Sequence, residues 1–253
     1  MIRVGVVGAA GKMGATVCDA VATADGLELV AAVDSHSVGQ VTNGVVISHE
    51  LKALADAHAE VVVDFTVAES SRVTLPWLAL HGMHAVVGTT GFSENDIDSF
   101  RRAFTASNCI IASNFAIGAI LMMRFAAMAA PYFETAEILE YHHDAKADAP
   151  SGTAVSTAQR MADASSEWAK DPTRNEIYAG ARGGKGPADI RVHSVRMRGM
   201  IAHQEVVLGT EGQTLTIRHD SYDRSSFMPG VVLACRHVAT TPGLTFGIDD
   251  LLK

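Results

Sequence analysis

Short apolar runs alternate with helical patterns over the first third of the chain. Five of these runs have the character of buried strands: Ile2–Val7, Leu27–Val33, Val61–Phe65, His84–Val87 and Cys109–Ala112. Helical spacing fills the gaps between them, with Gly26 ending the first helix and Ser93 a natural N-cap for a helix over Glu94–Ala106. Strands that are apolar throughout and separated by helices are typical of a parallel sheet covered on both faces. The pattern predicts an α/β doubly wound (Rossmann) domain.

The pattern changes after Asn114. An apolar helix and a strand-like run, Ala136–His142, come first, and a Gly/Pro-rich loop surrounds Lys185. Three strand-like runs then follow one another without helices: Arg191–Met197, Glu205–Leu208 and Thr214–Arg218. Consecutive strands favour an antiparallel or mixed sheet, so this part is predicted to be an α+β unit.

A helix over Pro229–His237 is expected to return to the first domain. The sequence therefore predicts two domains that are not consecutive halves. The first comprises 1–115 plus 227–253, and the second is an insertion over 116–226.

The glycine-rich segment Gly8–Gly14 joins the first strand to the first helix. Its GxxGxxG spacing is a weak motif alone, but a strand precedes it, a helix follows it, and Asp34 ends the second strand. Glycines permit a tight turn and close approach of a pyrophosphate, while an acid at the second strand accepts hydrogen bonds from a ribose. Dinucleotide binding is the prediction. The alternative is a tight βα turn in a protein that binds another ligand.

Asp34 also bears on the choice of cofactor. A carboxylate repels a 2′-phosphate, and Ser35 and His36 follow it where an arginine would grip that phosphate. Lys12 could reach over and replace part of the positive charge that such an arginine would supply to the 2′-phosphate. We expect NADH to serve at least as well as NADPH.

The densest chemical signal lies where a strand pattern ends in His142 and His143, with Lys146 close behind. These side chains supply positive charge and transferable protons, which indicates an anionic substrate and acid catalysis. The alternative is a solvated loop in which Asp144 and Asp148 neutralise the lysine. Two adjacent histidines point opposite ways on a strand and no third ligand is evident, so no metal is expected.

Ser151 is a natural N-cap for the helix that follows this cluster. The amides of Gly152 and Thr153 then form an anion site suited to a carboxylate.

Composition narrows the class of protein. The chain has 253 residues, 48% of them hydrophobic, and a net charge of −8. It is long enough to fold without disulfides, and its acidity argues against nucleic-acid binding. The apolar stretch Phe115–Phe133 contains Arg124 and Pro131 and is expected to be a buried helix, not a membrane span. No signal peptide is evident and the three cysteines lie far apart, so we expect reduced thiols in a cytoplasmic protein.

One basic cluster stands out in the insertion: Arg182, Lys185, Arg191, Arg196 and Arg198. One interpretation of this cluster is a solvated strand face or a subunit contact. The other is an extension of a dicarboxylate pocket.

Several motifs together resemble those of the 4-hydroxy-tetrahydrodipicolinate (dihydrodipicolinate) reductase family of bacterial diaminopimelate and lysine biosynthesis. The most specific is Glu-x-His-His-x-x-Lys-x-Asp-Ala-Pro-Ser-Gly-Thr at 140–153. With it stand Gly-Ala-Ala-Gly-Lys-Met-Gly at 8–14, Asp-Phe-Thr at 64–66, Gly-Thr-Thr-Gly at 88–91 and Ala-Ser-Asn-Phe at 112–115. The resemblance covers essentially the whole chain and is greatest to actinobacterial-type members.

The resemblance implies a role for each matching position. The pyrophosphate would lie on Gly8, Ala9, Ala10, Gly11, Lys12 and Met13, and the adenosine ribose on Asp34. The nicotinamide side would be lined by Gly88, Thr89, Thr90, Ala112, Ser113, Asn114 and Phe115. His142 would be the proton donor or acceptor and Lys146 the proton donor, with His143, Gly152 and Thr153 binding the dicarboxylate substrate.

The resemblance further implies an NADH- or NADPH-dependent reduction of the tetrahydrodipicolinate precursor, and a homotetramer built through the sheet of the insertion. Two alternatives remain at this point. One is another two-domain Rossmann dehydrogenase, and the other is a non-catalytic NADH-binding module.

Overall fold

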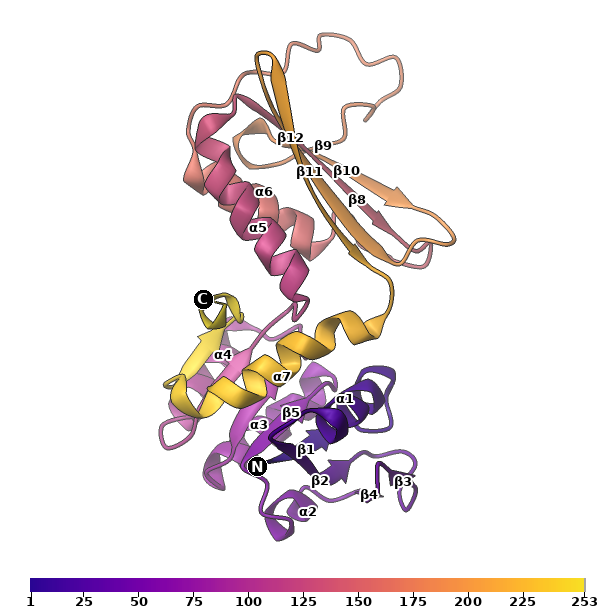
Figure 1. Cartoon of the computed structure of the whole chain (residues 1–253), viewed down its shortest axis with the longest axis vertical. Coiled ribbons are helices and arrows are strands. Elements are labelled where there is room, and N and C mark those ends of the chain that lie inside the picture. The colour runs from indigo at the N-terminus through magenta and orange to yellow at the C-terminus, as the bar shows by residue number, and fades with distance from the viewer. Residues whose placement is uncertain (253) are drawn as a thin grey trace. The chain divides into compact units, whose positions relative to one another are not determined.

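The computed structural model describes residues 1–252, which divide into two compact units. The first unit is Met1–Ala116 together with the segment that begins at Arg224, and the second unit is Ile117–Asp223. The expected boundaries were after 115 and after 226. Each unit is described by itself below, with its elements labelled in Figure 1.

The first unit is built on one sheet. Within the described chain its strands are β1 (Ile2–Val7), β2 (Leu27–Val33), β3 (Val41–Thr42), β4 (Val45–Ser48), β5 (Val61–Asp64), β6 (His84–Val87), β7 (Cys109–Ile111) and β13 (Leu244–Phe246). Their order is β13-β7-β6-β5-β1-β2-β4-β3, and every pair is parallel except β3 with β4. This confirms the doubly wound α/β architecture predicted from the apolar runs.

Helices cover both faces of this sheet: α1 (Lys12–Thr23), α2 (Lys52–Asp56), α3 (Ala68–Leu80), α4 (Glu94–Ala103) and α7 (Met228–His237). Leu54, Leu75 and Phe100 bring α2, α3 and α4 into one core with alternate strand residues. The strand residues between them face the other way, towards α1 and α7, which contact each other. Ser93 caps α4 as predicted, in a capping box with Asp96, although the helix ends at Ala103.

The second unit has a five-stranded mixed sheet in the order β12-β11-β8-β10-β9. Its strands are β8 (Thr135–His142), β9 (Gly184–Lys185), β10 (Arg191–Arg196), β11 (Ala202–Thr210) and β12 (Gln213–Ser221). The sheet is mixed, as predicted: β8 runs parallel to β10, with a helix between them in the chain, and antiparallel to β11. The helices α5 (Ile117–Ala129) and α6 (Gly152–Ala164) lie against one face of this sheet and leave the other face without a helix (Figure 1).

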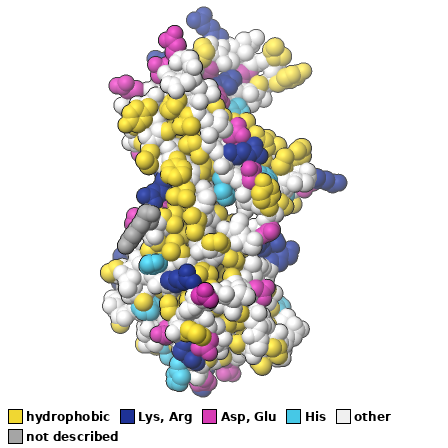
Figure 2. Space-filling model, viewed as in Figure 1, with side chains coloured by type: hydrophobic (Ala, Val, Ile, Leu, Met, Phe, Trp, Pro, Cys, Tyr) yellow, Lys and Arg dark blue, Asp and Glu magenta, His cyan; other side chains and the backbone are white. Residues whose placement is uncertain are grey.

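Short 3-10 turns complete the described elements: η1 (Ala130–Tyr132), η2 (Pro187–Asp189), η3 (Arg224–Phe227), η4 (Val238–Thr240) and η5 (Asp249–Leu251). The apolar stretch tested as a membrane span forms α5 and η1, with Ile120, Met122 and Met123 buried. Among residues 1–252, no helix combines the length and apolarity needed to cross a bilayer. Other hydrophobic side chains of α5 stay exposed, among them Phe125 and Met128, and Figure 2 shows such side chains gathered over this helix.

We expect Gly230→Ala to destabilise the first unit. Although alanine is the better helix former, a Cβ at this position of α7 would lie 2.0 Å from the Phe115 carbonyl oxygen and 2.9 Å from Ile248 Cδ1. Overpacking of this kind costs about 1–3 kcal/mol. Chemical denaturation measures the loss. The matched helical control is Gly152→Ala, where nothing lies within 4 Å of the added carbon, and equal stability of the two variants would contradict the prediction.

Candidate active site

The glycine loop after β1 has room for backbone and ligand but not for side chains. Gly8 has φ +82°, and a Cβ there would lie 2.8 Å from the Phe65 carbonyl oxygen. A Cβ on Gly14 would lie 1.9 Å from the oxygen of Gly8, so α1 begins very close to the loop. α1 starts at Lys12 after an N-cap glycine, with no acidic residue in its first turn. This cradle fits a diphosphate, which the amides and the positive end of a helix attract.

Asp34 lies beside this loop, directly after β2. Its Oδ2 accepts a hydrogen bond from the amide of Ala10 at 2.9 Å, and its Oδ1 accepts one from the amide of His36 at 2.8 Å. The two amides hold the carboxylate after the second strand, where an acidic residue of dinucleotide-binding folds accepts hydrogen bonds from ribose hydroxyls. The geometry therefore fits the adenosine half of NAD(P).

Asp64 organises the next loop, at the end of β5. Its side chain is buried, and Oδ1 accepts hydrogen bonds from the Thr66 amide (2.9 Å), the Thr66 hydroxyl (2.6 Å) and Thr89 Oγ1 (3.2 Å). Its Oδ2 accepts one from Ser71 Oγ at 2.9 Å. Burial raises the pKa of Asp64 above its ordinary value, and the hydrogen bonds from Thr66, Ser71 and Thr89 oppose that rise. Asp64 thus joins three segments at the carboxyl edge of the sheet.

The segments expected on the nicotinamide side follow β6 and β7 at this same edge. Gly88 packs against the ring of Phe65, since a Cβ there would lie 2.0 Å from the ring edge. Phe65 in turn meets the ring of Phe115, with centroids 5.7 Å apart. The segments 88–90 and 112–115 follow β6 and β7, which are neighbours in the sheet. In the same way, the glycine loop and Asp34 follow the neighbouring strands β1 and β2. Ligands of doubly wound sheets bind at this carboxyl edge, where the strand order reverses.

In the second unit, β8 carries Glu140 and His142 on one face because alternate strand residues share a face. The Glu140 side chain is fully buried, and its Oε2 lies 2.5 Å from Nδ1 of His142. Arg196 on β10 donates to both carboxylate oxygens at 2.9 Å. Glu140 is the first residue of the family motif at 140–153, but the motif alone assigns it no role. The signal that could have found it is its spacing of two residues from His142 on a strand.

This arrangement shifts the titration of both groups. Burial opposes ionisation of Glu140, but hydrogen bonds from Arg196, Ser194 and His142 outweigh it and hold the pKa of that carboxyl below its ordinary value. Burial lowers the pKa of His142, while Glu140 acts to raise it and the charges of Lys146 and Arg196 lower it further. His142 is therefore mainly neutral near pH 7, with the proton on the nitrogen that faces Glu140.

Lys146 lies in the loop 143–150 that follows β8. Its Nζ contacts both carboxylate oxygens of Asp148, at 2.8 and 2.9 Å, and this pairing lowers the pKa of Asp148. Of the two acids expected to neutralise Lys146 in the alternative interpretation, Asp148 pairs with it. Arg198 pairs with Asp144 at 2.9 Å. His143 is exposed as the first residue of the loop.

The helix α6 begins where this loop ends. Ser151 is its N-cap as predicted, with Oγ accepting from the amide of Ala154 at 3.2 Å, and Gly152 and Thr153 form its first turn. The amide of Ser151 donates to Oε1 of Glu140 at 3.2 Å. The second unit thus holds His142, Lys146 and the start of α6 around one buried carboxylate.

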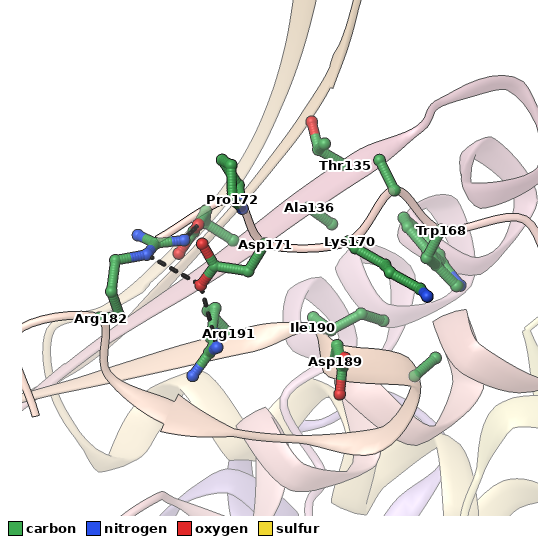
Figure 3. Close-up of a pocket in the computed structure, with 13 residues that line it drawn as sticks. Thr135, Ala136, Trp168, Lys170, Asp171, Pro172, Arg182, Asp189, Ile190 and Arg191 are labelled. Carbon is green, nitrogen blue, oxygen red and sulfur yellow. Dashed lines mark hydrogen bonds and ion pairs between the residues drawn. The ribbon is translucent and has the colours of Figure 1, made fainter. Parts of the chain in front are cut away.

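The basic cluster of the insertion is paired throughout with carboxylates. The partners are Glu137 and Asp171 for Arg182, Asp189 for Lys185, Asp171 for Arg191, Glu140 for Arg196 and Asp144 for Arg198. Figure 3 shows the Asp171 carboxylate between Arg182 and Arg191 in a pocket of the second unit. Basic and acidic side chains are likewise interspersed on the face drawn in Figure 2. The cluster therefore fits a solvated strand face or a subunit contact better than an extended anion pocket.

The three cysteines are free thiols, as expected from their wide separation in the sequence, and all three are buried. Burial raises the pKa of Cys18 to about 11 and that of Cys235 to about 12, so neither is a ready nucleophile. Within residues 1–252, no three histidine, cysteine or acidic side chains gather as a metal site would require.

A doubly wound sheet with this glycine loop and acid, joined to a unit that carries histidine and lysine, defines a class: two-domain dinucleotide-dependent oxidoreductases. An amine dehydrogenase from Mycobacterium smegmatis shares the fold alone, with a TM-score of 0.64, 13% identity and coverage of 98% of this chain and 95% of that one.

Sequence models of the family narrow the class. "Dihydrodipicolinate reductase, N-terminus" matches residues 2–115 and "Dihydrodipicolinate reductase, C-terminus" matches residues 118–252. The chain belongs to the dihydrodipicolinate reductase family, whose members are pyridine-nucleotide-dependent reductases of diaminopimelate and lysine biosynthesis. This confirms the resemblance drawn from the motifs.

Individual relatives match over their whole length. The 4-hydroxy-tetrahydrodipicolinate reductase of Nocardia farcinica is 50% identical, covering 99% of this chain and 98% of that protein. The enzyme of the same name from Mycolicibacterium vanbaalenii is 47% identical, covering 99% of each. A dipicolinate-bound dihydrodipicolinate reductase from Paenisporosarcina superposes with a TM-score of 0.89 at 38% identity, covering 100% of both chains.

Replacing Asp64 with asparagine should destabilise the first unit by about 1–3 kcal/mol, because an amide nitrogen cannot accept the hydrogen bonds that the lost oxygen received. Thermal and denaturant unfolding of the variant measure the loss. Asp56→Asn is the control, since that carboxylate is exposed and pairs with Lys52 in its own helix. A stability equal to that of the control would contradict the role given to Asp64.

Proposed function

We propose that the chain reduces 4-hydroxy-tetrahydrodipicolinate, or its dehydrated form, to tetrahydrodipicolinate with NADH or NADPH. The observation that carries the proposal is the arrangement of His142 and Lys146 around the start of α6 in the second unit. The full-length match to reductases of that name and the solved relative that binds dipicolinate, a dicarboxylate, support the substrate. A non-catalytic nucleotide-binding module would need no proton-transferring groups beside an anion site.

The proposed site places a cation where charge develops. The nicotinamide, when bound, supplies a hydride to the substrate ring, after which negative charge builds towards the ring nitrogen and adjacent carbons. Lys146 carries a positive charge that stabilises this charge, and it is a donor for the completing proton. His142 is a neutral imidazole whose Nδ1 is engaged by Glu140, so its Nε2 is the nitrogen left for the substrate.

Gly152 and Thr153 are proposed to hold a substrate carboxylate with the first turn of α6, and His143 to add a contact from the adjacent loop. The N-terminus of this thirteen-residue helix carries the positive end of its dipole, which favours an anion. Holding the carboxylate there converts binding energy into orientation of the ring. The second unit is accordingly proposed as the substrate-binding domain and the first as the dinucleotide-binding domain.

The proposed cofactor contacts are those expected from the sequence: the loop 8–13 for the pyrophosphate, Asp34 for the ribose, and the segments 88–90 and 112–115 for the nicotinamide. Both oxygens of Asp34 point at backbone amides, so the carboxylate stays where a 2′-phosphate would have to lie. NADH is therefore proposed to serve at least as well as NADPH.

A homotetramer in the cytoplasm is the proposed assembly, built through the sheet of the second unit. The face of this sheet without a helix carries Leu139 and Tyr141 of β8, which alternate with the buried Ile138 and Glu140. Glu137 shares this face, so the proposed contact with another copy would bury a mixed surface of apolar and charged side chains.

Oxidation of NADH followed by absorbance tests the function directly, with substrate generated in situ from pyruvate and aspartate semialdehyde. Turnover that depends on all components supports the proposal. Binding of NADH without turnover would replace the proposal with the non-catalytic module, and turnover of a different amino or sugar substrate would replace it with another dehydrogenase.

His142→Gln and Lys146→Ala should each lower turnover by roughly 10²-fold or more. Each removes a group that transfers a proton or stabilises the negative charge that develops on the substrate. Steady-state rates at saturating NADH measure the effect. Lys52→Ala, which removes an exposed lysine of the first unit, is the control. Rates near those of the wild type in both site variants would exclude these residues from the chemistry.

Asp34→Ala should raise the KM for NADH more than that for NADPH, because the carboxylate binds ribose hydroxyls and repels the 2′-phosphate. The two Michaelis constants are compared in the same assay. The assignment of Asp34 is wrong if NADH suffers no more than NADPH.

A further inference from the structure

The buried carboxylate of Glu140 contacts three separate parts of the second unit. Oε2 lies 2.5 Å from Nδ1 of His142, and Oε1 accepts from the amide of Ser151 at 3.2 Å. Arg196 donates to both oxygens at 2.9 Å. The chemistry proposed above uses the contact with His142 but gives Arg196 no part, and the contacts with His142 and Ser151 end on residues that flank the loop 143–150.

Arg196 extends this arrangement into the loop itself. Its Nη2 donates to the carbonyl oxygen of Asp148 at 2.6 Å, and its Nη1 donates to that of Val195 at 3.0 Å. The amide of Met197 donates to the carbonyl of His142 at 3.0 Å. The loop that carries Lys146 is therefore tied to β8 and β10 at both of its ends.

We propose that the Glu140–Arg196 pair is the positioning device of the substrate site. Glu140 fixes the ring of His142 by accepting its Nδ1 proton, which directs Nε2 away from the core. The pair also anchors the loop 143–150, and with it the place of Lys146. Both residues act through others and neither touches the substrate, so they are positioning residues. This inference rests on the proposed function of His142 and Lys146.

Charge gives the two members of the pair opposite effects on His142. The charged groups that act on the imidazole are Glu140 on its own strand, Arg196 opposite it on β10 and Lys146 in the loop, while β11 places the uncharged Ala202 opposite it. Glu140 acts to raise the pKa of His142, and Arg196 and Lys146 act to lower it. Removing one charge at a time should therefore move this pKa in opposite directions, which a loss of packing would not do.

The same strand offers a matched control in Glu137. Its carboxylate is also held by an arginine and a histidine, with Arg182 Nη2 and His193 Nε2 each at 2.5 Å. It lies on the opposite face of β8 from Glu140, three residues earlier. Glu137→Gln thus removes the same charge and the same kinds of hydrogen bond without touching His142 or the loop.

The experiment compares Glu140→Gln, Arg196→Gln and Glu137→Gln in the full chain by steady-state kinetics and by NMR titration of the histidine side chains. The His142 signal is assigned by its absence in His142→Gln. We expect Glu140→Gln to lower the pKa of His142 and Arg196→Gln to raise it. Both should reduce kcat roughly 10–100-fold with the KM for NADH unchanged, as misplaced catalytic groups do. Glu137→Gln should change neither the His142 pKa nor kcat.

A shift of the His142 pKa in the same direction in both site variants, or in neither, overturns the proposal, as does an equal loss of kcat in Glu137→Gln. If a glutamine variant does not fold, Arg196→Lys takes its place, because it keeps the charge and gives up the paired hydrogen bonds. That variant should retain the His142 pKa and still lose turnover, and wild-type turnover would overturn the anchoring of the loop. Failure of the proposed function is distinguishable, since the wild-type chain would then show no reductase activity while the titrations still report on His142.

Discussion

A carboxylate removed from water must receive hydrogen bonds or a counter-charge from the protein, and each unit of this chain builds its site around one such group. In the first unit the group is Asp64, under the carboxyl ends of the sheet. In the second unit it is Glu140, under the loop 143–150. Sheet pairing already brings β5 beside β6 and β8 beside β10. The two carboxylates fix the segments that follow these strands, among them Thr89 in the first unit and the start of α6 in the second.

The two carboxylates are satisfied differently, and the difference matters for chemistry. Asp64 receives hydroxyl and amide hydrogens but no cation, and burial raises its pKa. Such a carboxyl group tolerates protonation, and its hydrogen bonds hold neighbouring loops together. Glu140 faces Arg196, which holds its pKa down, so it stays ionised and keeps one tautomer of His142. Of the two carboxylates, Glu140 is the one whose charge acts on a proposed catalytic group, His142.

Local patterns predicted most of the fold because they depend on residues that are close in sequence. The five apolar runs of the first unit became β1, β2, β5, β6 and β7, and the caps at Ser93 and Ser151 depend on neighbours three residues away. The strands β3, β4 and β13 escaped prediction because they lie at or beside the edges of the sheet and are partly exposed. They lack the continuous buried run that marks the equally short β5, β6 and β7. β3 pairs with the adjacent β4, whereas β4 and β13 pair with β2 and β7, which lie further away in the sequence, and one sequence does not show such distant pairing.

The site shows the same division between local and distant information. The glycine loop, Asp34 and the His142–Lys146 cluster could be found from spacing and context. The partners of these groups could not, because Arg196 lies 56 residues from Glu140 and Thr89 lies 25 residues from Asp64. Basic residues of the insertion looked like a candidate anion site for this reason: their charge is visible in the sequence, whereas the carboxylates that pair with them are visible only in the fold. The chain has a net charge of −8, so it holds anionic ligands through local groups that such pairing does not consume. These groups are helix N-termini and loop amides. Lys146 joins them because its partner Asp148 is exposed, so that a substrate anion can replace this carboxylate beside the lysine.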